Sequence, residues 1–169
     1  MLSQQPHITT RWAEAKDCTG LQSIFRACWS EAYAGIIPAG NLSHMIAERD
    51  ASWWQPIARR TNEILLLEAS DSIAGYARLG PCRGRWRASG EIYELYVLPI
   101  FQGCGLGEHL FEAARQHLDA RDTKGLIVWT LADNTRAIDF YWRRGGRPIA
   151  KAQQLFGTKM LTRIAFAWS

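Results

Sequence analysis

The stretch from Glu91 to Glu108 constrains the fold more than any other part of this 169-residue sequence. It begins with a run typical of a buried strand, which ends at Val97, and continues into a glycine-rich turn. The turn opens a helix from Gly105 to about Ala120, with apolar side chains recurring on one face. The first turn of a helix has unpaired N–H groups and a positive dipole end, and glycines let a phosphate approach them closely. The stretch therefore predicts an anion cradle, with pyrophosphate as the expected ligand.

Three phosphate-binding motifs compete for this turn. The P-loop requires a lysine after its second glycine, and no lysine follows here. The dinucleotide fingerprint requires a glycine where Glu108 stands, and the turn lies too late in the chain for two Rossmann halves. The third pattern, Gln/Arg-x-x-Gly-x-Gly/Ala, is satisfied by Gln102, Gly105 and Gly107. A glycine turn that merely joins a strand to a helix is the alternative without a ligand.

The rest of the chain predicts a mixed α/β sheet in a single domain over residues 1–169. We expect strands at 8–12, 63–69, 73–79, 91–97, 126–131, 148–153 and 160–168, and helices around 21–29, 41–60, 105–120 and 135–144. Pro56 is expected to kink or divide the second helix, and Asn134 or Asp133 to cap the last one. One right-handed crossover is expected after Val97, and the last two strands are expected to close the sheet as an antiparallel pair.

Composition and patterning exclude several classes of protein. The 47% hydrophobic and 21% charged residues are ordinary for a globular chain, which excludes disorder, collagen and coiled coil. No run approaches 18 apolar residues, and the first residues lack the pattern of a secretory signal. A net charge of +4 is small for a dedicated nucleic-acid domain. The scattered cysteines and histidines show no metal-ligand spacing. We expect a cytoplasmic protein without metal, membrane or nucleic-acid partners.

The turn around Gln102 and a second segment, Ala132–Gly146, together resemble the GNAT superfamily of acetyl-CoA-dependent N-acetyltransferases. The resemblance covers most of the chain, from Ile8 onward. It implies a GNAT-like mixed, mostly antiparallel central sheet flanked by about four helices. It also implies an enzyme that moves an acetyl group from acetyl-CoA, as co-substrate, to a primary amine of a small molecule or peptide, by direct attack on the thioester.

The resemblance also implies which residues contact the cofactor. Backbone groups of Leu95, Tyr96 and Val97 should pair with the pantetheine arm. Asn134 should contact the CoA arm, and Tyr141 should lie near its sulfur. N–H groups of the turn should hold the pyrophosphate; the turn comprises Gln102, Gly103, Cys104, Gly105, Leu106, Gly107 and Glu108. Without the resemblance, Asn134 is an ordinary helix cap and Tyr141 is equally compatible with a core position.

Amine acetylation needs a base for the proton of the amine and benefits from an acid for the leaving thiolate. The resemblance makes Tyr141 the acid. It makes Glu91 the base, because some family members place a catalytic glutamate at this distance before the Gln102 position. Glu94 and water are the alternatives, and strand-end solvation is the non-catalytic interpretation of Glu91. Since they are three residues apart on one strand, Glu91 and Glu94 are expected to point to opposite faces of the sheet.

Two positions depart from the family pattern. Trp129 stands where members that acetylate protein N-termini often carry a glutamate, which weakens the interpretation as a ribosomal-protein enzyme and leaves the base open. Gly145–Gly146 replaces the usual Gly-Phe pair after the last helix. Two alternative functions also stay open: a non-catalytic CoA-binding sensor, and an acyltransferase that uses another acyl-CoA.

The acceptor is the least determined part of the prediction. Arg83, Arg85 and Arg87 crowd a glycine-bounded loop, with Trp86 among them and no acidic residue between Asp71 and Glu91. Such a loop favours an acceptor with an anionic group beside its amine, and a solvated hairpin tip is the alternative. The exposed tryptophans expected on such a chain are compatible with a homodimer.

Overall fold

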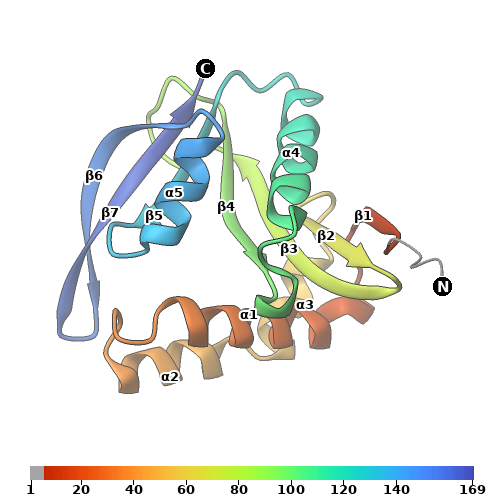
Figure 1. The fold of residues 1–169 in the computed structure, drawn as a ribbon, viewed down its shortest axis with the longest axis horizontal. Helices are drawn as coiled ribbons and strands as arrows, with labels where there is room; N and C mark the ends of the chain where they lie inside the picture. Colours follow the sequence, from red (N-terminus) through yellow and green to blue (C-terminus); the bar gives the residue numbers. More distant parts are fainter. Residues whose placement is uncertain (1–5) are drawn as a thin grey trace.

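The computed structural model describes residues 6–169 and contains a seven-stranded sheet in the order β1-β2-β3-β4-β5-β7-β6 (Figure 1). The strands are β1 (Ile8–Trp12), β2 (Ile64–Ala69), β3 (Ser72–Pro81), β4 (Gly90–Val97), β5 (Leu126–Leu131), β6 (Arg147–Phe156) and β7 (Lys159–Trp168). Neighbouring strands are antiparallel except for β4 and β5, which are parallel. The predicted mixed, mostly antiparallel sheet is confirmed.

The helices agree with the sequence pattern except in number. They are α1 (Cys18–Ala32), α2 (Ala39–Glu48), α3 (Ala51–Ala58), α4 (Leu106–Asp119) and α5 (Thr135–Arg143), with 3-10 turns η1 (Ala15–Asp17) and η2 (Pro99–Phe101). The expected helix over 41–60 is two helices, and the division is not at Pro56, which lies inside α3. The division falls at Arg49 and Asp50, because the Asp50 carboxylate accepts the N–H of Trp53 and starts a new helix.

The predicted antiparallel pairing of the last two strands is confirmed. Within the sheet β7 lies beside β5, and β6 forms the outer edge. After α5 the chain therefore skips the position beside β5 and forms the outer strand β6. It then turns back as β7, which fills the position between β5 and β6. No helix within residues 6–169 is long and apolar enough to cross a membrane.

Different helices pack on the two faces of the sheet, and they cover different strands (Figure 1). On one face, α4 and α5 pack against strands from β2 to β7 in a single apolar cluster that includes Phe111 and Tyr141. On the other face, α1 and α3 cover β2 and β3, with Phe25 and Trp54 buried between them. A third cluster joins the α1–α2 connection to β5 and β7. We call these the α4–α5 face and the α1–α3 face.

Candidate functional site

The site begins where β4 and β5 part. Their parallel pairing is limited to Gly90↔Leu126, Glu91↔Ile127 and Ile92↔Val128. Beyond these pairs β4 remains bonded to β3 as far as Val97, while β5 remains bonded to β7 (Figure 1). The edge of β4 that faces β5 at Leu95–Val97 therefore has no partner strand. We call this opening the wedge, and its free edge is where the sequence places the pantetheine contacts.

The glycine turn lies directly after the free edge of β4. Gly103 and Gly105 have φ of +81° and +82°, in the left-handed region that favours glycine, and a Cβ on either would meet nothing within 4 Å. Among residues 6–169, none of the six backbone N–H groups from Gly103 to Glu108 has a hydrogen-bond acceptor. Six free donors at the positive end of α4 are an arrangement that suits an anion.

Three contacts fix this turn to its surroundings. The Gln102 side chain donates to the Val97 carbonyl at 2.8 Å, and the Cys104 thiol donates to the Phe101 carbonyl at 2.8 Å. Leu106 is buried in the α4–α5 cluster. The turn is therefore tied at both ends while its N–H groups stay free.

The start of α4 also packs closely against α5. A Cβ on Gly107 would lie 3.3 Å from the ring of Phe140, so only a small residue fits here. The Glu108 carboxylate, which would repel an anion, accepts from Arg144 at 3.1 Å. The donors, the open space and this neutralised carboxylate all fit a diphosphate-bearing cofactor.

Asn134 and Tyr141 bring α5 to the wedge. The Asn134 Oδ1 caps α5 by accepting the N–H of Ala137 at 3.2 Å. The amide group of the same side chain also interacts with the hydroxyl of Tyr33. Tyr141 is buried against the rings of Phe111 and Phe166. Burial raises the pKa of the Tyr141 hydroxyl, so it stays protonated at neutral pH, as a proton donor must.

Tyr33 belongs to this group although the sequence did not indicate it. It follows α1, and its hydroxyl oxygen lies 3.1 Å from that of Tyr96 on β4. Burial raises the pKa of Tyr33, and its hydrogen bonds with Tyr96 and Asn134 act in the opposite direction. Tyr33 thus links β4 to the start of α5 across the wedge. Its only sequence signal is the i, i+4 spacing from Trp29, which core packing explains equally well.

A β-bulge changes the direction of the two candidate bases. Arg78 pairs with Glu94 and Leu79 pairs with Ile92, so Tyr93 is an extra residue on β4. The expectation that Glu91 and Glu94 point to opposite faces is therefore wrong, because the bulge inverts the alternation between them. Both carboxylates lie on the α1–α3 face, with the Tyr93 ring between their arginine partners, Arg83 and Arg78.

The two carboxylates are held differently. Glu91 is 1% exposed and accepts from the backbone N–H and the guanidinium of Arg83, at 2.8 and 2.9 Å. The Arg83 side chain is 63% exposed. Glu94 accepts from two guanidiniums, Arg49 and Arg78, which are 20% and 14% exposed. Arg49 is further fixed between aromatic rings, 4.3 Å from that of Phe25. Glu91 is therefore the less tightly held of the two.

The arginine loop is not the unpaired cluster that the sequence indicated. Arg83 is bound to Glu91, while Arg85 and Arg87 are exposed in a segment without strand structure. Trp86 leans toward β5, where its ring lies 5.8 Å from that of Trp129. The expected alternation of three arginines on one side of an extended loop is absent.

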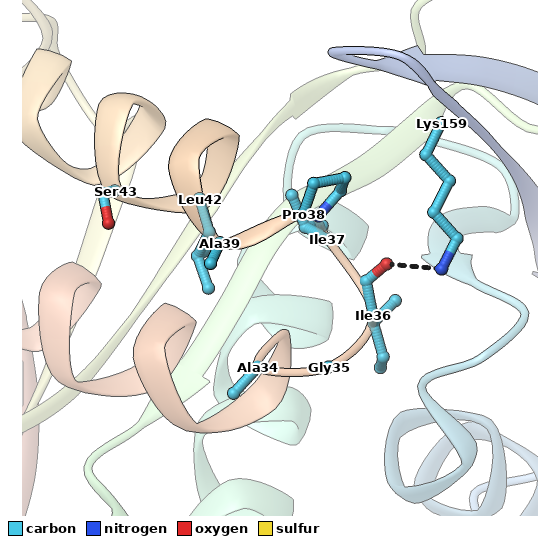
Figure 2. A pocket seen from close by; sticks show the side chains of 9 residues that line it. All are labelled: Ala34, Gly35, Ile36, Ile37, Pro38, Ala39, Leu42, Ser43 and Lys159. Carbon is cyan, nitrogen blue, oxygen red and sulfur yellow. Dashed lines mark hydrogen bonds between the residues drawn. The ribbon is translucent and has the colours of Figure 1, made fainter.

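A cavity of about 370 Å³ lies between the α1–α2 connection and β7. It is lined by residues 34–39, by Leu42 and Ser43, and by Lys159, whose ammonium donates to the Ile36 carbonyl at 3.1 Å (Figure 2). The cavity begins one residue after Tyr33, so it lies beside the wedge on the α1–α3 side. No three His, Cys, Asp or Glu side chains among residues 6–169 are grouped to hold a metal ion.

Comparisons with known proteins agree with this arrangement. The model of the Acetyltransferase (GNAT) family matches residues 19–146. A mycothiol acetyltransferase of Arthrobacter sp. (strain FB24) is 31% identical over 110 residues, which are 63% of this chain and 33% of that protein. The chain thus spans about a third of the length of such curated relatives.

Solved structures show the same fold. The PaiA N-acetyltransferase of Thermoplasma acidophilum, in complex with coenzyme A, matches with a TM-score of 0.76 at 18% identity, covering 93% of this chain and 98% of that one. The yncA protein of Salmonella typhimurium, with acetyl-CoA, matches with a TM-score of 0.66 at 20% identity, covering 95% and 92%.

Proposed function

Because this chain belongs to the Acetyltransferase (GNAT) family, we propose that it transfers the acetyl group of acetyl-CoA to a primary amine of a small molecule or peptide. The observation that carries the proposal is the cradle of free N–H groups at Gly103–Glu108, directly after a strand edge that no strand covers. Such a cradle suits a pyrophosphate, and a free strand edge suits an arm that contains amides.

In this proposal each part of the wedge has one role toward the cofactor. The N–H groups of the turn hold the pyrophosphate, the edge at Leu95–Val97 pairs with the pantetheine arm, and the Asn134 amide contacts the same arm. Bound acetyl-CoA supplies an acetyl group activated as a thioester. The α4–α5 face carries the cradle and is covered by helices, so the amine approaches from the α1–α3 face.

Residues of this chain transfer two protons during the reaction: one to the leaving sulfur and one from the attacking amine. The amine nitrogen forms a bond to the acetyl carbon, and the carbon–sulfur bond breaks with its electron pair going to sulfur. Tyr141 gives its proton to that sulfur and regains one from water. Glu91 accepts the proton that the nitrogen loses, directly or through a water molecule.

Glu91 is assigned as the base because it is held by fewer charged partners than Glu94. Glu94 accepts from two guanidiniums on largely buried side chains, whereas Glu91 accepts from one guanidinium on an exposed side chain and from a backbone N–H.

The proposal is tested by offering acetyl-CoA and a panel of amines to the protein and measuring release of CoA together with the mass of each acceptor. The panel includes mycothiol lacking its acetyl group, because relatives are named mycothiol acetyltransferases. We expect at least one acceptor to gain one acetyl group. Tight binding of acetyl-CoA without acetylation of any amine would instead favour a sensor. Faster reaction with a longer acyl-CoA would favour a different acyl group.

A further inference from the structure

Trp129 lies at the point where β5 parts from β4. It follows Val128, the last residue of β5 that pairs with β4. Val128 belongs to the α4–α5 cluster, and Leu131 packs with Tyr33 in the cluster beside α1. Because side chains alternate along a strand, Trp129 lies on the same face as Leu131, the α1–α3 face. This is the face from which we propose that the amine approaches.

Arg163 lies over this tryptophan. It is opposite Leu131 in the β5–β7 register and therefore shares its face. Its guanidinium carbon is 4.6 Å from the centre of the Trp129 ring. The charge of Arg163 is thus held over β5, one strand away from the free edge of β4. Stacking uses the flat face of a guanidinium and leaves the N–H groups at its rim to bind a ligand.

Arg163 is a charged group beside the wedge with no counter-ion among the described residues. Glu91 and Glu94 are each paired with arginine. Arg163 forms no ion pair with any residue from 6 to 169. Its Nε is buried and has no hydrogen-bond acceptor in the same part of the chain. A guanidinium without a counter-ion is suited to receive an anion at its outer N–H groups.

We propose that Arg163, supported by Trp129, binds a carboxylate or phosphate group carried by the acceptor amine. This inference rests on the proposed acetyltransferase function and specifies its substrate class. Trp129 directly follows the last pair between β4 and β5, so a charge held over its ring lies at the border of the wedge. Amino acids and short amino phosphates carry an anionic group close to the amine. The subsite replaces the arginine loop, whose Arg83 is already bound to Glu91.

The test uses pairs of amines that differ only in the anion. Phenylalanine is compared with phenylalaninamide, and phosphoethanolamine with ethanolamine, by kcat/KM for acetylation. The amine of phenylalaninamide loses its proton more readily than that of phenylalanine, so a preference for the amino acid cannot come from amine reactivity. We expect the anionic member to be preferred in at least one pair. The pair that shows this preference tells whether the subsite binds a carboxylate or a phosphate. Preference for the neutral member in both pairs would overturn the inference.

Two variants of Arg163 and one control separate the subsite from general packing. Arg163→Gln should lower kcat/KM for the anionic acceptor by about 10- to 150-fold, the range for a hydrogen bond to a charged group, and change that for the neutral partner little. Arg163→Lys should retain part of the preference. The control is Arg147→Gln, because Arg147 also stacks on a tryptophan, Trp142, at 4.6 Å but lies on β6. Equal losses for anionic and neutral acceptors in Arg163→Gln would overturn the inference.

A binding measurement keeps this inference separate from the proposed function. In the presence of CoA, N-acetylphenylalanine should raise the melting temperature of the wild type more than N-acetylphenylalaninamide does, and Arg163→Gln should abolish the difference. If no amine is acetylated yet this difference is present, the proposed function fails and the anion subsite stands. If amines are acetylated and this difference is absent, the anion subsite fails and the proposed function stands.

Discussion

The two sides of the wedge are built in different ways. On the α4–α5 side the groups that we propose to bind the cofactor are main-chain N–H groups, and their positions depend on Gly103 and Gly105. On the α1–α3 side the groups that we propose to bind the acceptor are side chains from strands and loops distant in sequence, and most of the charges there are already paired. A backbone site requires glycines at fixed spacing, so it leaves a motif in the sequence. A side-chain site requires only that the fold bring residues together.

The paired charges of the α1–α3 side also differ among themselves. Glu94 is enclosed with Arg49 and Arg78, an arrangement that stabilises the packing of α2 and β3 against β4. Glu91 depends on one arginine from an exposed loop. The first arrangement is suited to stability and the second to a group that must exchange a proton.

The largest expected effect concerns Tyr141, where α5 meets the wedge. Tyr141→Phe removes the hydroxyl with little change in volume. General acid catalysis contributes about 10²–10⁴-fold, so kcat should fall by about that factor while the affinity for acetyl-CoA is nearly retained. The measurement is steady-state kinetics on an acceptor for which chemistry is rate-limiting. An unchanged kcat would remove Tyr141 from the mechanism and leave the wedge without its acid.

The next effect separates the two carboxylates of the α1–α3 side. Glu91→Gln should lower kcat/KM by roughly 10²-fold, at the lower end of the range for general bases because water remains as a proton acceptor. The loss should be greatest at low pH, where the free amine is scarce. Glu94→Gln should leave kcat close to that of the wild type.

Glu94→Gln, which should affect activity less than Glu91→Gln, should affect stability more. Glu94→Gln leaves Arg49 and Arg78 without their shared charge partner and should reduce the free energy of unfolding by about 1–3 kcal/mol. Glu91→Gln should reduce it less, since its partner is exposed to water. Denaturant unfolding measures both values. Reversed rankings in activity would transfer the role of base to Glu94.

The third effect tests the backbone side of the wedge. Gly105→Asp introduces a carboxylate among the free N–H groups and should weaken acetyl-CoA binding by about 10- to 150-fold, the loss expected for hydrogen bonds to a charged group. The control is Gly145→Asp, because Gly145 has a similar φ of +87° and equally open space but ends α5. Calorimetry on both variants separates the added charge from backbone strain. Equal affinities in the two variants would contradict the cradle.

The sequence revealed the strands and the glycine turn because both depend on local patterns. The alternation of β4 and the glycines after it are contiguous, so the turn lies where the motif placed it, and its binding of pyrophosphate stays a prediction. The sequence did not reveal the bulge at Tyr93, because an extra residue appears only once β3 fixes the register. It likewise missed Tyr33 and Arg163, whose relevance comes from contacts with Tyr96 and Trp129 that depend on the fold.

The smallest expected effect concerns the tyrosines that join α1 and β3 to β4. Tyr33→Phe removes the hydroxyl that bonds Tyr96 at 3.1 Å, so kcat/KM should fall by about fivefold, the equivalent of about 1 kcal/mol for one hydrogen bond. The control is Tyr76→Phe, because the Tyr76 hydroxyl is buried without a partner among residues 6–169. Removing an unsatisfied hydroxyl should leave activity unchanged and stability equal or higher. If the two variants behave alike, the hydroxyl of Tyr33 does not position the wedge, and its ring serves only the packing between α1 and the sheet.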